Sequence, residues 1–219
     1  MNQVLRKPNT CRGCPLYPKY NHGTFSHPDG TGNNGVMILG EALGQREALT
    51  GLPFMGQAGA QINRTIPRIQ MQRSDFSWWN TVACRPPNNW LEGAPWHFEA
   101  VENCHQYFVQ QLQRFKPKVI VPTGNVPLRK LLHISGIQEK RGYVYDAYIP
   151  MPDGRPYKCY VVPTVHPAFI MRGKQNWTWV QMRDLQKAVD VAKNGPPKYS
   201  PVYTLYPSLY DLVTFYNAA

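Results

Sequence analysis

Four short apolar runs, separated by segments with a helical pattern, constrain the fold of this chain more than any other feature. Each run is bounded by Gly, Pro, Asn or His, as buried strands commonly are. Strands that alternate with helices form a parallel sheet with helices on both faces. The sequence therefore predicts an α/β fold with strands near 36–39, 76–80, 118–122 and 160–164 and helices near 58–70, 97–115, 126–132 and 179–193.

Turn signals between these segments predict how the rest of the chain is organised. Asp153-Gly154 followed by Pro156 predicts a β-hairpin between about 143 and 162, placed before the fourth sheet strand. Residues 20–35 are rich in Gly, Asn, His and Pro, which favours a surface loop. Two prolines end the last helix, and five tyrosines follow them. We expect one domain over residues 1–195 and a tyrosine-rich tail over 196–219.

The charge balance is strongly positive and favours a polyanionic partner. The chain has 24 Lys and Arg against 13 Asp and Glu, a net charge of +11. A solvated basic face would also explain this charge, but nucleic acid is the commonest partner of such a protein. The start of the chain lacks the apolar core of a secretory signal, and no stretch approaches the roughly 18 apolar residues of a membrane span. We therefore expect a cytoplasmic, monomeric, DNA-binding protein.

Four of the five cysteines have a spacing that suits a metal centre. Cys11-x-x-Cys14 lies in a Pro- and Gly-rich opening, Cys84 follows a strand, and Cys104 lies in a helical stretch. A close pair with two further thiolates can complete a site of four sulfurs. An iron-sulfur cluster, a structural zinc and simple buried thiols all remain open on this pattern. Cys159 lies in a predicted strand and is interpreted as a small apolar residue.

Polar and aromatic side chains follow the strands at their carboxyl ends, where the sites of parallel sheets lie. Glu41 and Phe54 follow the first strand, Asn80 ends the second, Gly124-Asn125 follows the third and His166 follows the fourth. Each residue alone is more often structural than functional. Their joint arrival at one edge of the sheet predicts a site.

These residue types suit the recognition and removal of a nucleobase. Phe54 could stack on an extruded base and Asn80 could hydrogen-bond a pyrimidine edge. His166 could stabilise charge on the departing base, and Glu41 could activate water or stabilise an oxocarbenium-like sugar. The sequence therefore predicts a pocket for a flipped base.

The segment after His166 is open to two interpretations. Phe169 and Ile170 could form a wedge that fills the gap left by an extruded base, while Arg172 holds phosphate. Alternatively, the segment starts a helix whose apolar side chains lie in the core.

Four motifs occur in order along the chain: Gly40-Glu41-Ala42-Leu43-Gly44, Gly51-Leu52-Pro53-Phe54-Met55-Gly56-Gln57-Ala58-Gly59, Asn80 ahead of Cys84-Arg85-Pro86-Pro87, and His166-Pro167-Ala168. Together with the four cysteines, they resemble the iron-sulfur uracil-DNA glycosylases, families 4 and 5 of that superfamily. The resemblance runs from Cys11 to about Lys193.

The resemblance implies a fold, a cofactor, a reaction and a set of site residues. The fold would be a three-layer α/β/α sandwich with a central four-stranded parallel sheet and an Fe-S cluster loop region. A [4Fe-4S] cluster would bind Cys11, Cys14, Cys84 and Cys104, and the reaction would be hydrolysis of a base-sugar bond. The implied catalytic residues are Glu41, Asn80 and His166, the base-binding residues Phe54, Asn80, Glu47 and Ala42, and the DNA-binding residues Arg85, Arg141, Phe169, Ile170 and Arg172.

Departures from the family pattern leave the excised base open. Leu43 stands where the family usually has proline, and residues 88–96 replace a familiar Asn-Arg pair with a longer loop that carries two tryptophans. We expect a monofunctional glycosylase that removes uracil or a related pyrimidine in base-excision repair. The alternatives are a glycosylase that removes hypermodified pyrimidines, such as glucosylated hydroxymethylcytosine, from phage DNA in antiviral defence, and a non-catalytic Fe-S DNA-binding module.

Overall fold

The computed structural model of the chain describes residues 7–17, 24–197 and 208. The tyrosine-rich tail expected over 196–219 lies outside the described residues except for Pro196, Pro197 and Ser208. The tail and its boundary therefore stay a prediction.

The centre of the fold is a mixed sheet of six strands in the order β1-β3-β2-β4-β6-β5. Its four inner strands pair in parallel, as expected from the alternation of strands and helices. The sheet is larger than the expected four-stranded parallel sheet, because one antiparallel strand is added at each edge. The strands are β1 Asp29–Gly30, β2 Val36–Ala42, β3 Ser77–Val82, β4 Val119–Pro122, β5 Tyr145–Ile149 and β6 Tyr157–Val161.

The sequence predicted a surface loop where β1 lies and a separate hairpin where β5 lies, so neither segment was expected to form an edge of the sheet. Strand β1 has only two residues, so the segment that contains it resembles a loop in sequence. The expected hairpin is present as β5 and β6, but it does not precede the fourth parallel strand. Strand β6 is itself that fourth strand, because it pairs in parallel with β4 on its other side.

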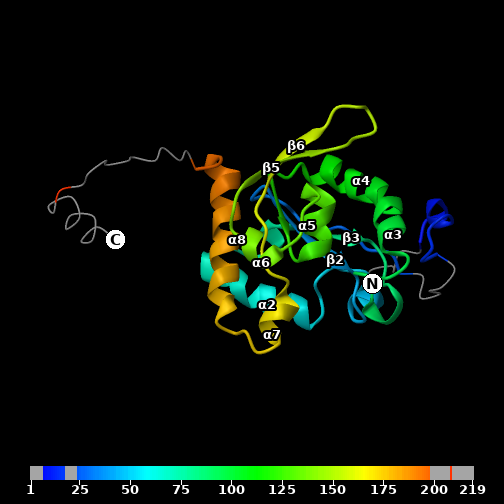
Figure 1. The fold of residues 1–219 in the computed structure, drawn as a ribbon, viewed down its shortest axis with the longest axis horizontal. Helices are drawn as coiled ribbons and strands as arrows, with labels where there is room; N and C mark the ends of the chain where they lie inside the picture. The colour runs from blue at the N-terminus through cyan, green and yellow to red at the C-terminus, as the bar shows by residue number, and fades with distance from the viewer. Residues whose placement is uncertain (1–6, 18–23, 198–207, 209–219) are drawn as a thin grey trace.

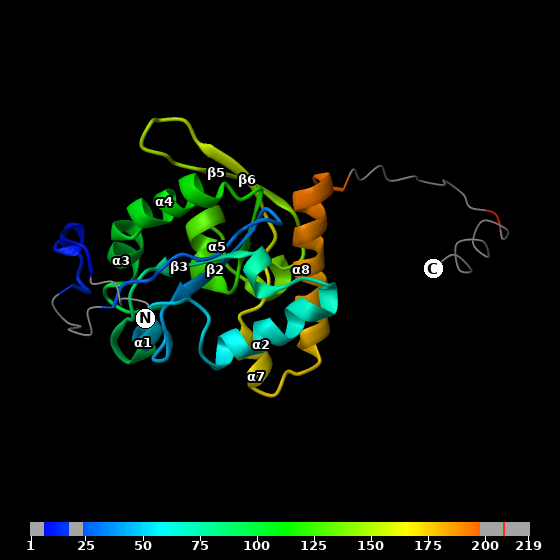
Figure 2. The ribbon, with the colours of Figure 1, turned by 180° about the vertical axis from the view of Figure 1, so that it is seen from behind.

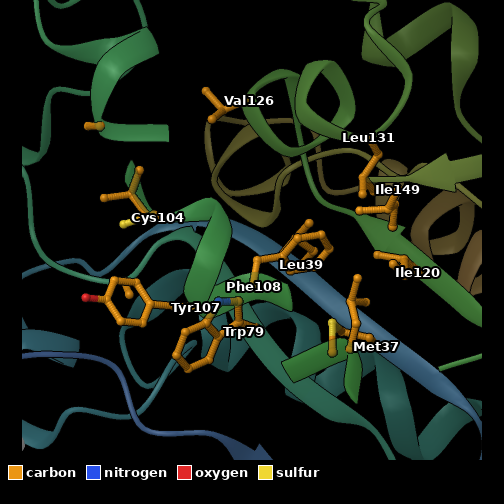
Figure 3. Packing of buried hydrophobic residues seen from close by; sticks show 14 of the residues in the cluster. Met37, Leu39, Trp79, Cys104, Tyr107, Phe108, Ile120, Val126, Leu131 and Ile149 are labelled. Carbon is orange, nitrogen blue, oxygen red and sulfur yellow. The ribbon is translucent and has the colours of Figure 1, made fainter. Parts of the chain in front are cut away.

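Helices cover both faces of the sheet, and the side chains of β2 show why. Met37 and Leu39 pack with the residues of α3, α4 and α5, whereas Val36 and Ile38 pack with those of α2 and α8. This alternation follows from the period of two in a strand. Figures 1 and 2 show the two helical layers, and Figure 3 shows the first of the two cores, with Met37, Leu39 and Phe108 packed together.

The longer helices agree with the sequence pattern apart from two interruptions. The expected helix near 97–115 breaks at Cys104, which ends one helix and begins the next. The helix near 58–70 continues past Thr65 as a 3₁₀ turn that contains Pro67. The helices are α1 Glu47–Thr50, α2 Gln57–Thr65, α3 His97–Asn103, α4 His105–Phe115, α5 Asn125–Leu132, α6 Ile137–Lys140, α7 Pro167–Met171 and α8 Trp177–Asn194, with 3₁₀ turns at Asn9–Cys11, Ile66–Ile69, Arg73–Asp75 and Pro87–Asn89.

Within the described ranges, none of the helices combines the length and the apolar character that crossing a bilayer would need.

Candidate functional site

A cavity of about 660 Å³ lies beyond the carboxyl ends of β2, β3 and β6. It brings together seven of the residues that the sequence singled out, and they come from four separate segments of the chain. These are Glu41, Ala42, Glu47, Phe54, Asn80, His166 and Arg172.

Phe54 forms an aromatic wall of the cavity and is held in an uncommon backbone conformation. Its φ is 56°, in the left-handed region that non-glycine residues rarely adopt. The ring is 5% exposed and packs edge-on against Trp78, with ring centroids 5.2 Å apart. Gly59 permits this arrangement, because a Cβ there would lie 1.6 Å from the carbonyl oxygen of Phe54. The surrounding backbone therefore fixes the ring.

Asn80 offers a free hydrogen-bond donor in the cavity. Its side chain is buried, with 3% exposure, and its Oδ1 would lie 2.3 Å from a Cβ placed on Gly40. Among the described residues, Nδ2 of Asn80 has no hydrogen-bond partner. A buried unpaired donor costs free energy, which a ligand acceptor would recover. The arrangement suits a ligand that presents a carbonyl oxygen to Asn80.

Two glutamates line the cavity and differ in their surroundings. Burial raises the pKa of Glu41 above its usual range; the Glu92 carboxylate raises it further, and a backbone hydrogen bond from Glu92 opposes both. Glu47 is buried and accepts a 2.7 Å hydrogen bond from the backbone N–H of Gly56. Glu47 thus ties the turn after β2 to the loop that carries Phe54, whereas Glu41 is the carboxylate placed for proton chemistry.

The surroundings of His166 determine its charge and its tautomer. Its Nδ1 accepts a hydrogen bond of 3.2 Å from the backbone N–H of Ala168. Burial, together with the nearby Arg172, lowers the pKa of the imidazole to about 4. The ring is therefore neutral at pH 7, and with Nδ1 acting as an acceptor the proton lies on Nε2. A neutral N–H donor is available for an oxygen that gains negative charge.

Arg73 braces the wall of the cavity, a role that its sequence context did not signal. Its guanidinium donates to the carbonyl oxygen of Pro53 at 2.8 Å and to Asn63 Oδ1 at 3.0 Å, and it forms an ion pair with Asp29. The same group lies over the ring of Trp78, 4.1 Å from the centroid. Arg73 therefore joins the residue before Phe54 to the tryptophan that supports its ring.

We expect the substitution Arg73→Ala to lower the free energy of unfolding by about 1–3 kcal/mol, because it removes two hydrogen bonds and a stacking contact. The ion pair with Asp29 adds little, since both side chains are 24% exposed. Urea denaturation would measure the change, with the exposed Arg155→Ala as control. Equal stability of the two variants would contradict the role of Arg73 as a brace.

The predicted DNA-contacting residues occupy different surroundings. Arg172 lines the cavity, whereas Phe169 packs on Trp177 and Ile170 lies in the core with 1% exposure. For Ile170 this is the core alternative rather than the wedge. Arg141 makes two hydrogen bonds, of 2.9 and 3.0 Å, to the buried carboxylate of Asp184 and does not line the cavity.

Other cavity-lining positions were missed or given too little weight in the sequence. Asn89 and Pro86 line the cavity, and Arg85 donates a 2.8 Å hydrogen bond to Asn89 Oδ1. Pro86 belongs to the third motif, whereas Asn89 lies in a segment that was marked only by its departure from the family sequence. Asn125 accepts backbone hydrogen bonds from Gly136 and Ile137, which is a structural role.

Leu43, the residue of the first motif that differs from the family pattern, is buried. Only 1% of it is exposed, although it also borders the cavity. Its side chain therefore packs mainly against protein.

The four cysteines of the predicted metal centre lie in one buried part of the core. Cys11, Cys14, Cys84 and Cys104 are between 4% and 8% exposed. Burial raises the pKa of Cys84 to about 11; Lys7 opposes this shift, and Cys14 and Cys11 add to it. Among the residues that the structure describes, no group of three His, Cys, Asp or Glu is arranged to hold a metal ion. The donor set of four thiols suits iron or zinc, and its occupant stays a proposal.

The fold and the site together define a class of protein. An α/β sheet carries at its carboxyl edge a cavity with an aromatic wall, an amide with a free donor, a neutral imidazole and a carboxylate of raised pKa. These functional groups are typical of an enzyme that binds a flat heterocycle and stabilises it as a leaving group.

Comparison with known proteins gives the family. The model of the Uracil DNA glycosylase superfamily matches residues 27–190, and the chain belongs to that superfamily. It is 34% identical to the type-4 uracil-DNA glycosylase of Pyrobaculum aerophilum over 74% of this chain and 80% of the relative. Identity to the type-4 enzyme of Archaeoglobus fulgidus is 30% over 78% and 83%, and to that of Thermotoga maritima 28% over 88% and 95%.

Proposed function

We propose that the chain is a monofunctional DNA glycosylase that excises uracil from DNA and leaves an abasic site, as a step of base-excision repair. The observation that carries this proposal is the unpaired Asn80 Nδ2 in a cavity with an aromatic wall. Uracil presents the carbonyl O4 as an acceptor for that donor, and the ring can stack on Phe54. The names of the relatives favour the same substrate.

The reaction divides among the cavity residues. After the nucleotide is flipped, the bond between the sugar C1′ and the base N1 breaks, and its electron pair goes to the base. The neutral Nε2–H of His166 donates a hydrogen bond to the developing negative charge on O2. The carboxylate of Glu41 orients a water molecule that adds to C1′, and the proton that this water loses neutralises the uracil anion, so that uracil and an abasic sugar are formed.

Four cysteines supply the sulfur donors that a cluster requires, at a place away from this chemistry. We propose that Cys11, Cys14, Cys84 and Cys104 hold a [4Fe-4S] cluster, which when bound would cross-link the N-terminal segment to the end of β3 and the junction of α3 and α4. The electrostatic influence of Cys11, Cys14 and Cys84 on Cys104 supports their proximity.

The two other functions considered are less well supported. Excision of hypermodified pyrimidines and non-catalytic DNA binding both remain compatible with the fold, but the relatives are named as uracil-DNA glycosylases. Glu41 and His166, which a pure binding module would not need, line the same cavity as Phe54 and Asn80.

A direct test is base release from defined oligonucleotides. The protein would be incubated with single- and double-stranded oligonucleotides that contain uracil, hypoxanthine, 5-hydroxymethylcytosine or its glucosylated form, and abasic sites would be cleaved with alkali. We expect strand breaks at uracil. Strand breaks only at a modified cytosine would show that this base, and not uracil, is the substrate. The absence of strand breaks in every oligonucleotide would overturn the enzymatic function.

The pH dependence of uracil release should be set by Glu41 and not by His166. Glu41 must be ionised to orient water, so kcat/KM should fall as the pH decreases through the pKa of Glu41, which burial holds above its usual value of 4.5. His166, with a pKa of about 4, stays neutral above that pH. Single-turnover rates between about pH 4 and 8 would measure the profile. The acid limb should disappear in Glu41→Gln and persist in His166→Asn, each at a reduced rate.

A further inference from the structure

A loop between β3 and α3, here called the tryptophan loop and defined as residues 85–96, borders the cavity, and only its first three residues, Arg85-Pro86-Pro87, belong to a family motif. Pro86 and Asn89 line the cavity directly. Further along the loop, the backbone of Glu92 hydrogen-bonds to Glu41. Trp90 therefore lies between two positions that touch the site, and it is half exposed, at 50%.

The tryptophan loop holds this exposed ring in place. Leu91 and Ala94 are buried, with 1% and 6% exposure, and anchor the loop in the core. The indole Nε1 of Trp90 donates to the carbonyl oxygen of Glu92 at 3.0 Å, and that of Trp96 donates to the carbonyl oxygen of Trp90 at 3.3 Å. The two rings meet edge to face, with centroids 5.6 Å apart. The exposed face of Trp90 is therefore pre-organised.

Cations line the cavity that the loop borders, and the exposed carboxylate of Glu92 in the loop is paired with Arg129 at 3.4 Å. Arg46 and Arg172 line the cavity, and Arg85 is fastened to Asn89 within the loop. Cations placed beside an exposed aromatic ring are the usual arrangement for binding single-stranded nucleic acid, in which bases stack on aromatic rings while cations follow the phosphates. The net charge of +11 has the sign that such a partner requires.

We propose that Trp90 is a stacking platform for a base that neighbours the flipped nucleotide in the same DNA strand. The inference rests on the proposed function, which supplies the flipped nucleotide in the cavity. Flipping removes one stacking partner from each neighbouring base, and the indole of Trp90 replaces that partner. The loop thereby extends recognition beyond the cavity, and it favours strands whose neighbouring bases are free to unstack.

Binding to oligonucleotides tests this role without requiring catalysis. A fluorescein-labelled single strand with a central tetrahydrofuran abasic analogue would be compared with one in which the nucleotides on both sides are also abasic. We expect the wild-type protein to bind the first about tenfold more tightly than the second. Trp90→Ala should bind both equally, and Trp90→Phe should keep part of the preference. Tyr148→Ala, which removes an exposed aromatic side chain on the edge strand β5, should behave as the wild type.

Several outcomes would overturn the proposal. Equal binding of the two oligonucleotides by the wild-type protein would exclude a stacked neighbour, whether or not uracil is released in other assays. A preference that survives in Trp90→Ala would place the stacking elsewhere. Unchanged DNA binding in every variant would assign the exposed indole to another class of partner, such as a protein. Thermal denaturation would verify that each variant is folded.

Discussion

The substitution Gly40→Ala should abolish most of the uracil-excising activity, lowering kcat/KM by about 10²–10³. Gly40 has no Cβ, and the space that a Cβ would fill belongs to the site. A methyl group there would lie 2.3 Å from Asn80 Oδ1 and 2.7 Å from Phe54 Cζ. Both side chains must then move away from the base. The backbone of Gly40 does not have the positive φ that would itself disfavour alanine.

Steady-state kinetics on a uracil-containing single strand would measure the loss, with thermal denaturation beside it. Asn194→Ala is the control, since Asn194 is exposed at the end of α8 and lines neither the cavity nor the cysteine cluster. If the base binds in this cavity, Gly40→Ala should lower kcat/KM for uracil by a larger factor than it lowers the affinity for DNA with an abasic site, which has no base to place there. Wild-type kinetics in Gly40→Ala would show that the base binds elsewhere.

The second large effect is expected from Cys104, a proposed ligand of the cluster. If the cluster is present as proposed, Cys104→Ser should abolish iron binding and lower the midpoint of thermal unfolding by roughly 10 °C or more, because the proposed ligation would join three distant segments of the chain. Cys104 also ends α3 and begins α4, so its release would loosen both helices. Iron and sulfide analysis, visible absorbance and thermal denaturation would measure these changes.

Cys159→Ser provides the control, because Cys159 is a buried thiol in β6 that lies outside the proposed ligand set. Both variants place a hydroxyl in the core, so the cost of burying a polar group is similar. Loss of iron in Cys104→Ser alone would distinguish a ligand from a packing residue. Stoichiometric zinc in the wild-type protein would replace the cluster proposal.

Much of the fold was predictable because local sequence determines it. The runs that contain Ile38, Trp79 and Val121 are apolar on both faces of the sheet, and this indicates buried parallel strands. Strand β1 was not predictable, since a pair of residues such as Asp29-Gly30 has no periodicity. The parallel pairing of β6 with β4 was not predictable either, because a hairpin signal indicates the partner on one side of a strand and gives no information about the other side.

The candidate site was predictable for a different reason. In a parallel sheet the carboxyl ends of the strands share one edge, so Glu41, Asn80 and His166 could be grouped from strand positions alone. The brace by Arg73 could not be, because its hydrogen-bond partners lie 10 and 20 residues away along the chain. The tautomer of His166 likewise depends on a backbone contact that no residue pattern indicates.

The left-handed backbone of Phe54 has a consequence for how such an enzyme can diversify. The aromatic wall is held by Gly40, Gly59 and the guanidinium of Arg73, so a new orientation of the ring would require several coordinated changes. The ring of Trp90, in contrast, is held by two hydrogen bonds within the tryptophan loop, and a change at this position leaves the wall intact. A change in which bases are accepted beside the flipped nucleotide would therefore require fewer substitutions in the tryptophan loop than a change of the excised base would require at the aromatic wall.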